Sequence, residues 1–536
     1  MKTIKIILTF ALLFSVAKAQ NIEWKWALQG GGNSWDHGYA IAIDNDNNVL
    51  IRGKFVNVGY FGDTSIKAVG AEEDYLAKYT EDGQLIWIRI LAGKASWEKD
   101  RTIAIDENNN IYLTGYFNSP YGFDHINLSP YGANDGYIAK LNTKGEYIWV
   151  NRIGGSGDDA GYAIAYTHNK LLVAGYYSDT AFFPSGDLIS SGGNDIYVAC
   201  YDENGNNNWT VNGGSLNNDR AYGIAADQDY FYITGRIDGN AAFDGIHLST
   251  LGPSDLIVAK YDLNGNIIWA VNDASSGELE SKTIACSGGD IYLTGKFSGA
   301  VTFGSLTLTA LGLSDAYIVK FNENGNIEWV DIFTGGFANE GNSITIKDSR
   351  VYTIGVFGQS LDIGDTTLNC MGSRDSYVSC YSVDGEFVWA SDFGVSTGIN
   401  HVLGNSIAVD QKGAIYVGGE YSGGASFGGS NLTPNGSFDM FLFKLHDLVI
   451  PASTNHYMQK PRLEIYPNPN HGIFEIQTAG QIKIDISIFD NNGKLILKKA
   501  VISGQQIDIS SFPEGIYYLQ KTAEQGQLKK ILYIKE

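Results

Sequence analysis

The sequence predicts an all-β chain, most of which forms a seven-bladed β-propeller of four-stranded antiparallel blades. Three observations carry the prediction. Tryptophan recurs about every 60 residues, four short β-branched and aromatic segments recur in order within each period, and Asn-Gly or Asp-Gly separates the last two segments. A fixed period of this length indicates a repeat protein. The recurring tryptophans are Trp26, Trp87, Trp149, Trp209, Trp269, Trp329 and Trp389.

The two ends of the repeat region complement each other. Residues 22–28 contain Trp26 and resemble the fourth segment of a repeat, but they belong to no complete repeat. The last repeat, residues 406–445, has the first three segments and lacks the fourth. We therefore expect the N-terminal strand to complete the last blade, which protects both sheet edges.

Each segment has a composition that suits one place in a blade. The first is small and apolar, as in residues 163–165, and fits a crowded central axis, whereas the second ends in glycine, as in residues 232–235. The third starts with Asp, as in residues 135–140, and the fourth carries the tryptophan, which can fill the space between neighbouring blades. Asn-Gly tolerates the positive φ of a tight turn, so the third and fourth segments should form a hairpin, as at 264–265.

The aspartate that starts the third segment is interpreted as scaffold, because a residue needed in every blade is better explained by structure than by catalysis. Its carboxylate can accept backbone N–H bonds from the preceding glycine-rich turn. The Asn- and Asp-rich run 44–48 is also interpreted as a turn, since Phe55 stands where a calcium loop needs a glutamate. The recurring aspartates are Asp135, Asp195, Asp255, Asp315, Asp375 and Asp439.

Several repeat motifs point to a known repeat type. They are Gly-Gly-Ser-Gly-Asp-Asp at 154–159, Ala-Ile-Ala at 163–165, Gly-Tyr at 175–176, residues 193–199 and Trp209. Over about residues 22–446 the chain looks like the bacterial SBBP-type β-propeller repeat. This resemblance implies the propeller fold and supplies no shared catalytic residues. Cys200 and Cys380 depart from it by replacing the repeat lysine, and Glu73 replaces the repeat aspartate.

Other segments flank the repeats. Residues 1–19 are typical of a signal peptide, since Lys2 and Lys5 precede an apolar run too short to span a membrane, and small residues follow it. The propeller is expected over residues 20–446, and residues 447–462 are typical of a linker. Residues 463–536 hold about seven short strand-like segments, which predict a small β-sandwich. No transmembrane segment is expected.

The C-terminal segment carries Tyr-Pro-Asn-Pro at 466–469, Gly-Ile-Tyr-Tyr-Leu at 515–519 and Lys-Lys-Ile-Leu at 529–532. The individual residues are Pro467, Asn468, Pro469, Gly472, Phe474, Gly515, Tyr517, Lys529 and Lys530. They resemble the type A sorting domain of the type IX secretion system of Bacteroidota. The resemblance implies passage across the outer membrane by the type IX machinery, then release or anchoring. We therefore expect a secreted or cell-surface protein after removal of the signal peptide.

Composition and missing motifs narrow the functional classes. The net charge of −22 disfavours nucleic-acid binding, because an acidic surface repels phosphate backbones. No helix or Gly-Lys-Ser/Thr follows the glycine-rich turns, and the Gly-x-Ser-x-Gly and His-Glu-x-x-His motifs are absent. We expect no catalytic set, metal or cofactor. Cys370 and Cys380 lie in one repeat and could pair after export.

The loops that lead into the first strand of each repeat vary far more than the strands do. In propellers these loops line one face around the central channel, and binding residues concentrate in variable loops on a rigid scaffold. Their mixture of aromatic and polar side chains suits a sugar or a peptide. We therefore predict non-enzymatic binding or adhesion, with a glycan or protein ligand. The candidate residues are Trp35, His37, Tyr39, Trp97, Arg101, Asp159, Tyr162, Asp219, Arg220, Tyr222, Glu280, Lys282 and His401.

Two alternatives stay open. Glu98 and Asp219 could act across the channel as acid and base of a polysaccharide hydrolase or lyase. Two carboxyl groups about 5–10 Å apart in a cleft would favour glycoside hydrolysis, whereas carboxyl groups scattered over a flat rim would not. The chain could instead be a structural adhesin whose whole surface contributes.

Overall fold

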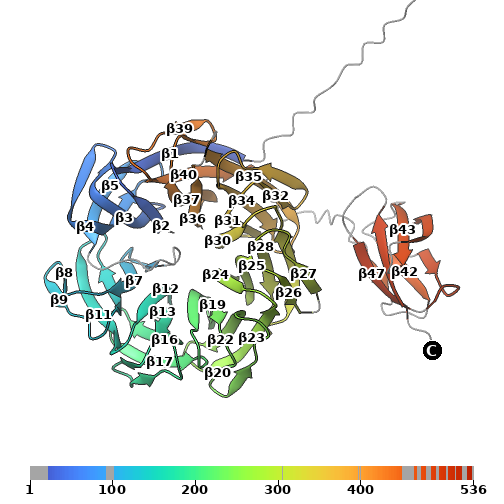
Figure 1. Ribbon diagram of the computed structural model, residues 1–536, viewed down its shortest axis with the longest axis horizontal. Helices are drawn as coiled ribbons and strands as arrows, with labels where there is room; N and C mark the ends of the chain where they lie inside the picture. The colour runs from blue at the N-terminus through green and yellow to red at the C-terminus, as the bar shows by residue number, and fades with distance from the viewer. Residues whose placement is uncertain are drawn as a thin grey trace, which may run out of the picture. The chain divides into compact units, whose positions relative to one another are not determined.

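The computed structural model describes residues 22–91, 102–304, 306–395, 398, 400–448, 464–466, 472–477, 484–490, 494–501, 505–513, 515–521 and 528–533 (Figure 1). Every regular secondary-structure element assigned in these residues is a β-strand. The chain divides into two compact units, Met1–Val449 and Ile450–Glu536, which we describe separately. The predicted signal peptide and most of the predicted linker lie outside the described residues.

The larger unit consists of repeats in which four strands pair antiparallel, from the first strand to the fourth. The first strands are β2 (His37–Ile43), β6 (Ile103–Ile105), β12 (Ala160–Thr167), β18 (Arg220–Ala226), β24 (Leu279–Ser287), β30 (Glu340–Lys347) and β36 (Val402–Val409). The second strands are β3 (Val49–Phe61), β7 (Ile111–Phe117), β13 (Lys170–Tyr177), β19 (Tyr230–Ile237), β25 (Asp290–Phe297), β31 (Arg350–Phe357) and β37 (Ala414–Tyr421).

The outer half of each sheet contains the third and fourth strands. The third strands are β4 (Thr64–Tyr79), β10 (Asp135–Leu141), β16 (Asp195–Asp202), β22 (Asp255–Asp262), β28 (Asp315–Phe321), β34 (Asp375–Ser382) and β40 (Asp439–Asp447). The fourth strands are β5 (Leu85–Leu91), β11 (Tyr147–Gly155), β17 (Asn207–Gly213), β23 (Ile267–Ser275), β29 (Ile327–Phe333), β35 (Phe387–Val395) and β1 (Ile22–Gly32).

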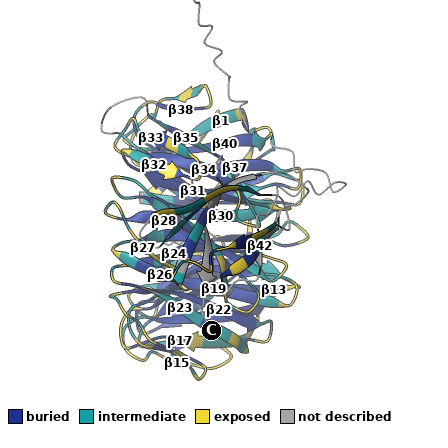
Figure 2. Cartoon of the chain, turned by 90° about the vertical axis from the view of Figure 1, so that its right-hand side faces the viewer, coloured by how far each residue is buried: buried dark blue, intermediate teal, exposed yellow. Residues whose placement is uncertain are grey.

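The first strands lie side by side in a closed circle, in which β2 contacts both β6 and β36. Figure 1 shows the sheets arranged around the centre of this circle. The larger unit therefore has a β-propeller-like fold. In Figure 2 its strands are mostly buried and its turns exposed, because apolar side chains of each sheet pack against the next. One such core joins Ala163 and Leu172 of one sheet to Ile224 and Ile233 of the next.

The N-terminal strand β1 pairs with β40, the third strand of the last repeat. Their antiparallel register runs from Ile22 opposite Asp447 to Gly30 opposite Met440, with a bulge near Trp26. The predicted pairing of the first strand with the last repeat is confirmed. It leaves no unpaired outer edge on β40, since β37 covers the other side.

Six of the seven repeat tryptophans pack on the hairpin turn of the following repeat. Trp149 Nε1 donates a 3.1 Å hydrogen bond to the Glu203 carbonyl oxygen. Gly205 in that turn has φ +84°, and a Cβ at this position would lie 3.0 Å from the Trp149 ring. Both the positive φ of the Asn-Gly turn and the space-filling role of the tryptophan are confirmed. The same contact recurs at Gly83, Gly145, Gly265, Gly325 and Gly385.

The recurring aspartates hold the turns that precede the third strands. Asp135 accepts hydrogen bonds from the N–H groups of Tyr131 (2.8 Å) and Gly132 (3.1 Å). Glu73, the predicted departure, accepts one from Gly70 N–H at 3.0 Å. The scaffold interpretation is confirmed, since equivalent bonds reach Asp195, Asp255, Asp315, Asp375 and Asp439.

Short hairpins between the second and third strands were not predicted. They are β8 (Tyr121–Phe123) with β9 (Ile126–Leu128), β14 (Thr180–Phe182) with β15 (Leu188–Ile189), β20 (Ala241–Phe243) with β21 (Ile246–Leu248), β26 (Ala300–Phe303) with β27 (Leu306–Thr309), β32 (Ser360–Ile363) with β33 (Thr366–Asn369), and β38 (Ala425–Phe427) with β39 (Ser430–Leu432). Several extend the fourth strand of the preceding repeat, as β14 does with β11. They tie neighbouring sheets together at the periphery.

The four cysteines are free thiols, so the possible Cys370–Cys380 pair is not formed in this structure. Cys200 and Cys380 are buried opposite Trp209 and Trp389 in their hairpins. They occupy the position at which Lys140 reaches over to the Glu203 carbonyl oxygen of the next repeat, 3.3 Å away.

The smaller unit contains two antiparallel sheets. One has the order β41 (Glu464–Tyr466), β42 (Ile473–Gln477), β45 (Gln505–Asp508). The other has the order β44 (Leu495–Val501), β43 (Ile484–Asp490), β46 (Gly515–Lys521), β47 (Leu528–Tyr533). Phe474 and Ile507 of the first sheet share one apolar core with Ile486, Ile488 and Leu519 of the second.

Candidate binding site at the channel mouth

The first strands share a β-bulge near their N-terminal ends. In β2 the register shifts between Gly38 and Ala40, so Tyr39 is an extra residue without an opposite partner. A bulge bends the strand and re-aims the extra side chain. We call the end of the inner strands that carries these bulges the channel mouth. The bulged residues are Tyr39, Tyr162, Tyr222, Lys282, Asn342 and Asn405.

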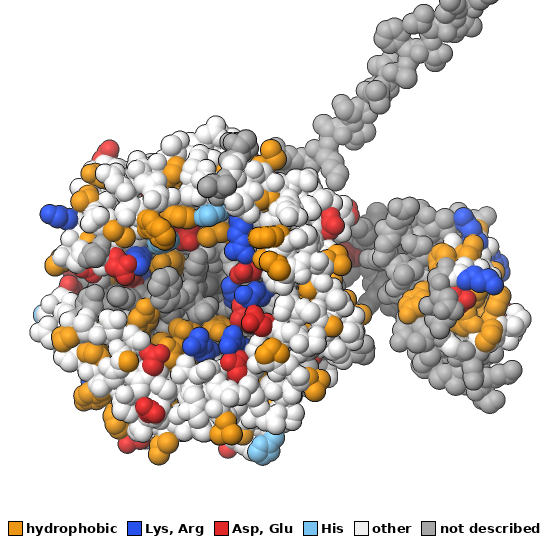
Figure 3. All heavy atoms as spheres, in the orientation of Figure 1, with side chains coloured by type: hydrophobic (Ala, Val, Ile, Leu, Met, Phe, Trp, Pro, Cys, Tyr) orange, Lys and Arg blue, Asp and Glu red, His pale blue; other side chains and the backbone are white. Residues whose placement is uncertain are grey.

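Figure 3 shows that Lys, Arg, Asp and Glu side chains gather on one side of the hollow centre, near β24, β25, β30 and β31. Glu280 lies 3.3 Å from Lys296 Nζ, and Glu340 lies 2.8 Å from Lys282 Nζ. Arg374 also contacts Glu340, at 3.3 Å. We call these residues, together with Arg236, the charged sector.

The cations of the charged sector lower the pKa of Glu340. Burial alone would raise the pKa of this carboxyl group, but Lys282, Lys296 and Arg374 lower it to about 2. Arg236 is held by Asp238 at 2.7 Å and lies 4.0 Å from Glu280. Glu340 is therefore ionised at neutral pH, and both Glu280 and Glu340 are paired with cations.

Tyrosines occupy the neighbouring part of the mouth. Tyr162 stacks on Tyr222 with ring centroids 5.8 Å apart, and Tyr162 meets Tyr176 edge-on at 5.2 Å. The Arg220 guanidinium lies over the Tyr176 ring, 5.0 Å from its centroid. We call Tyr162, Tyr176, Tyr222 and Arg220 the tyrosine sector. Its rings are largely buried, which leaves their polar edges and Arg220 toward the mouth.

A third group of side chains lies where the first repeat meets the last repeat. His37 Nδ1 is 2.6 Å from Glu420 Oε2, and the His37 ring stacks on Tyr39 with centroids 5.5 Å apart. The Phe438 ring contacts Trp35 and His401, with centroid distances of 5.5 and 5.1 Å. Trp35 is 56% exposed, so its ring can contact a ligand. Burial, together with Arg374, lowers the pKa of His401.

Asp159 and Asp219 take a different position from the one expected. Both side chains are fully buried. Asp219 accepts the Ser215 N–H at 2.5 Å and the Asp238 N–H at 2.8 Å, so both of its oxygens hold backbone turns. Asp159 does the same for Gly155 and Ser178. Neither carboxylate faces the channel mouth, because the loop before the first strand folds it inward.

Burial has a large effect on these carboxyl groups. It raises the pKa of Asp159 to about 7 and that of Asp219 to about 6. The backbone hydrogen bonds oppose the rise, while the neighbouring Asp135 and Asp195 add to it. Burial, with a contribution from the neighbouring Asp36, also raises the pKa of Asp439 to about 7.

The structure thus brings the remaining described candidates into three adjoining groups: Tyr162, Arg220 and Tyr222, then Glu280 and Lys282, then Trp35, His37, Tyr39 and His401. Trp97 and Arg101, and Glu98 of the hydrolase alternative, lie outside the described residues. Sequence reasoning missed Arg236, Lys296 and Glu420. Each follows the glycine that ends the second segment of its repeat, and that position could have identified them.

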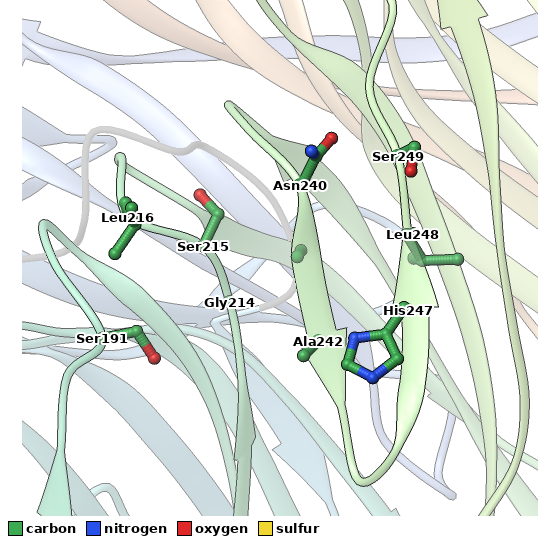
Figure 4. Close-up of a pocket in the computed structure, with 10 residues that line it drawn as sticks. Ser191, Gly214, Ser215, Leu216, Asn240, Ala242, His247, Leu248 and Ser249 are labelled. Carbon is green, nitrogen blue, oxygen red and sulfur yellow. The ribbon is translucent and has the colours of Figure 1, made fainter.

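A separate cavity of about 350 Å3 lies away from the channel mouth, between β17 and the β20–β21 hairpin. Figure 4 shows Ser191, Ser215, Asn240 and His247 around it, with Leu216 and Leu248 as apolar walls. It is shallow, and both polar and apolar side chains line it. Among the described residues, no group of three or more His, Cys, Asp or Glu side chains could hold a metal ion. The described part of the chain also contains no helix able to cross a membrane.

Two curated proteins have sequences similar to this chain, and both are longer. A WD repeat-containing protein of Acanthamoeba polyphaga mimivirus is 24% identical over 450 residues, which cover 67% of this chain and 32% of the relative. The regulatory protein FlaEY of Caulobacter vibrioides is 22% identical over 374 residues, 64% of this chain and 38% of that protein. The chain therefore spans about a third of the length of these relatives.

Solved structures show only distant likeness. Drosophila plexin A in complex with semaphorin 1b is 10% identical, with a TM-score of 0.37 over 80% of this chain and 88% of that one. The endosialidase of phage phi92 is also 10% identical, with a TM-score of 0.37 over 95% and 87%.

The C-terminal unit gives a definite family match. Residues 464–535 match the secretion system C-terminal sorting domain, and they include the described Gly472, Phe474, Gly515 and Tyr517. Pro467, Asn468 and Pro469 lie outside the described residues, and Lys529 and Lys530 are on β47. Residues 464–535 are therefore a secretion system C-terminal sorting domain, which indicates export through type IX secretion and attachment at the cell surface.

Proposed function

We propose that the chain is a seven-bladed β-propeller that binds a glycan or a protein at its channel mouth and catalyses no reaction. In this proposal a signal peptide (1–19) and a C-terminal β-sandwich (463–536) serve export, and residues 447–462 link the sandwich to the propeller (20–446). The repeats would be of SBBP type and the source a member of the Bacteroidota.

The strand order supports the blade number. Seven first strands lie in a closed circle in the described residues, each with a second and third strand beside it. The fourth strand of the last blade is β1, which precedes all the others in sequence. The shared apolar core of the two C-terminal sheets likewise supports a sandwich.

One observation carries the binding function. The bulged position has a constant backbone geometry in six described repeats, yet it holds Tyr in three of them, Lys in one and Asn in two. Packing alone would accept one residue type at equivalent positions. Different side chains at one position of a repeated scaffold give the mouth an irregular lining, as recognition of a polymer requires.

Exposed apolar side chains on the same face support the proposal. Arg374 and His401 form a parallel bridge, which places the turn before a third strand beside the loop before the next first strand. These turns and loops carry large exposed side chains around the mouth: Trp35, Tyr131, Leu251, Leu311 and Met371. Exposed apolar side chains of this size can add contact area for a ligand.

The contacts disfavour the hydrolase alternative. A glycoside hydrolase needs one carboxyl group that is protonated near neutral pH and a second carboxylate across a cleft. Asp219 has the raised pKa, but its two oxygens hold the Ser215 and Asp238 N–H groups. Glu340 faces the mouth, but three cations hold its pKa at about 2, so it would not donate a proton.

A glycan and polysaccharide array, probed with the purified chain, tests the proposal. We expect a defined set of hits that the Trp35→Ala and Lys282→Ala variants lose, because both side chains lie at the mouth. Arg89→Ala, on the exposed outer strand β5, is the matched control and should keep the hits. A pull-down on outer-membrane extracts with the same variants covers a protein ligand. Hits that survive both mouth variants would overturn the proposed site, and no hit in either format would overturn the binding function.

A further inference from the structure

One pair of opposite residues at the mouth consists of two arginines, whereas none of the equivalent pairs does. In the register of β18 and β19, Arg220 lies directly opposite Arg236. The equivalent pairs in the other described repeats are His37 with Lys54, Ala160 with Tyr176, Glu280 with Lys296, Glu340 with Val356, and Leu403 with Glu420. Two arginines in directly opposite positions repel each other. Such a local conflict in a folded protein is typical of a functional position.

The surroundings neutralise one of the two arginines only. Arg236 pairs with Asp238 at 2.7 Å and lies 4.0 Å from Glu280. Among the described residues, Arg220 has no carboxylate within 4 Å, and its Nε is buried without a hydrogen-bond partner. A guanidinium that is partly withdrawn from water and unpaired has a strong preference for an anion.

The tyrosine sector keeps Arg220 in place. Its guanidinium lies 5.0 Å from the centroid of the Tyr176 ring, and the Tyr222 hydroxyl hydrogen-bonds to it. Tyr176 is fixed in turn by a 3.1 Å hydrogen bond to Asp158 and by the edge of Tyr162. The cation is therefore ordered before any ligand arrives, which reduces the entropy lost on binding.

We propose that Arg220 is the anion-binding residue of the channel mouth and that it holds the carboxylate of an acidic saccharide, such as a uronate. This inference rests on the proposed glycan-binding function and adds a charge preference to it. A guanidinium matches a carboxylate through two parallel N–H···O bonds. Arg236, across the strand pair, stays paired with Asp238, so Arg220 is the cation left for the ligand.

The charge of the whole chain limits the ligand further. With a net charge of −22, the chain repels polyanions at a distance, whereas Arg220 acts only at contact. The site therefore suits a saccharide with a single or terminal uronate rather than a densely charged polyuronate.

The test uses the full chain labelled with 15N, glucuronate as the probe, and its methyl ester as the uncharged counterpart. NMR follows the Arg220 Nε–H signal, which is assigned by its loss in Arg220→Gln. We expect glucuronate to shift this signal saturably and the methyl ester to leave it unchanged. Arg220→Gln should weaken glucuronate binding about tenfold or more, the size of one charged hydrogen-bonded contact. Arg89→Gln, on an exposed outer strand, should bind as the wild type does.

Three results would overturn the inference: an unshifted Arg220 signal, equal shifts with the ester, or shifts of the same size with chloride and sulfate, which would mark a general anion site. The wild-type spectrum decides the first two even if the variant folds poorly. If the array hits are neutral glycans and the Arg220→Gln variant still binds them, this inference is overturned and the proposed function stands. A wild-type chain that gives no hit on the array and none in the pull-down would overturn both.

Discussion

Each sheet of the larger unit has two ends: one carries the hairpin turn between the third and fourth strands, and the other lies at the channel mouth. The two ends differ in how strictly their residues and contacts recur from one repeat to the next. At the hairpin-turn end, six tryptophans meet the turn glycine of the next repeat in the same way, from Gly83 on Trp26 to Gly385 on Trp329. At the channel mouth, the bulged positions hold tyrosine, lysine or asparagine on the same backbone. Ring closure requires identical contacts between neighbours, but it places no demand on a side chain aimed at the channel. We therefore expect the turn end to set stability, and we propose the mouth end as the recognition surface.

The largest effect is expected at the turn end. Gly265 has φ +88°, and a Cβ there would lie 3.0 Å from the Trp209 ring. Gly265→Ala should lower the free energy of unfolding by about 2–4 kcal/mol, measured by urea denaturation. Gly245→Ala is the matched control, because φ is +84° there but nothing lies within 4 Å of the added Cβ. Equal losses in both variants would show that backbone strain, not the tryptophan contact, carries the effect.

The buried aspartates should make the stability of the larger unit depend on pH. Their folded pKa values of about 7 for Asp159 and Asp439 and about 6 for Asp219 lie above the ordinary 3.8. Their contribution to stability is therefore fully present below pH 3.8 and is lost as pH rises through 6 to 7. The wild-type melting temperature should fall between pH 5 and 8.

Asp219→Asn should reduce that fall, by on the order of 2 kcal/mol in the free energy of unfolding between the two pH values. Asp262→Asn is the control: burial would raise the pKa of Asp262, but hydrogen bonds from Asn266, Asn264 and Gly265 together lower it. A melting temperature in Asp219→Asn that depends on pH as steeply as in the wild type would contradict the assignment.

Glu340 should show the opposite sign. Its folded pKa of about 2 lies below the ordinary 4.5, so its contribution is present above pH 4.5 and is lost as pH falls toward 2. Glu340→Gln should cost about 1–2 kcal/mol at pH 7, because it leaves Lys282 and Arg374 without their carboxylate. The cost should shrink at pH 3. Glu328→Gln, in a more exposed ion pair with Lys320, should change stability by less than about 1 kcal/mol.

The smallest effect on stability is expected for Trp35→Ala, within about 0.5 kcal/mol, because the side chain is 56% exposed. The same variant should weaken ligand binding about tenfold, as loss of an exposed aromatic contact does. Thermal unfolding and titration with an array hit measure the two quantities. A destabilisation as large as that of Gly265→Ala would remove the distinction between the two ends.

Sequence reasoning recovered the features that recur. The tryptophans, the Asn-Gly turns, the turn-holding aspartates and the pairing of the first strand with the last repeat could all be read from spacing and residue type. The bulge at Tyr39 could not, because a bulge is a register difference between two strands and becomes visible only when they pair. Asp219 was misplaced for a related reason: its residue type suits both a binding loop and a buried turn, and burial decides between them.

The sequence by itself determined the strand content, the repeat length, the closing strand and the sorting domain, since each rests on short-range patterns that the chain carries several times or in a fixed motif. The tertiary structure decided which polar side chains face one another. Arg220 and Arg236 are 16 positions apart along the chain, and only the pairing of β18 with β19 places them opposite each other. Electrostatic interactions depend on distance through space, and the order of residues does not fix that distance until the sheets close into a circle.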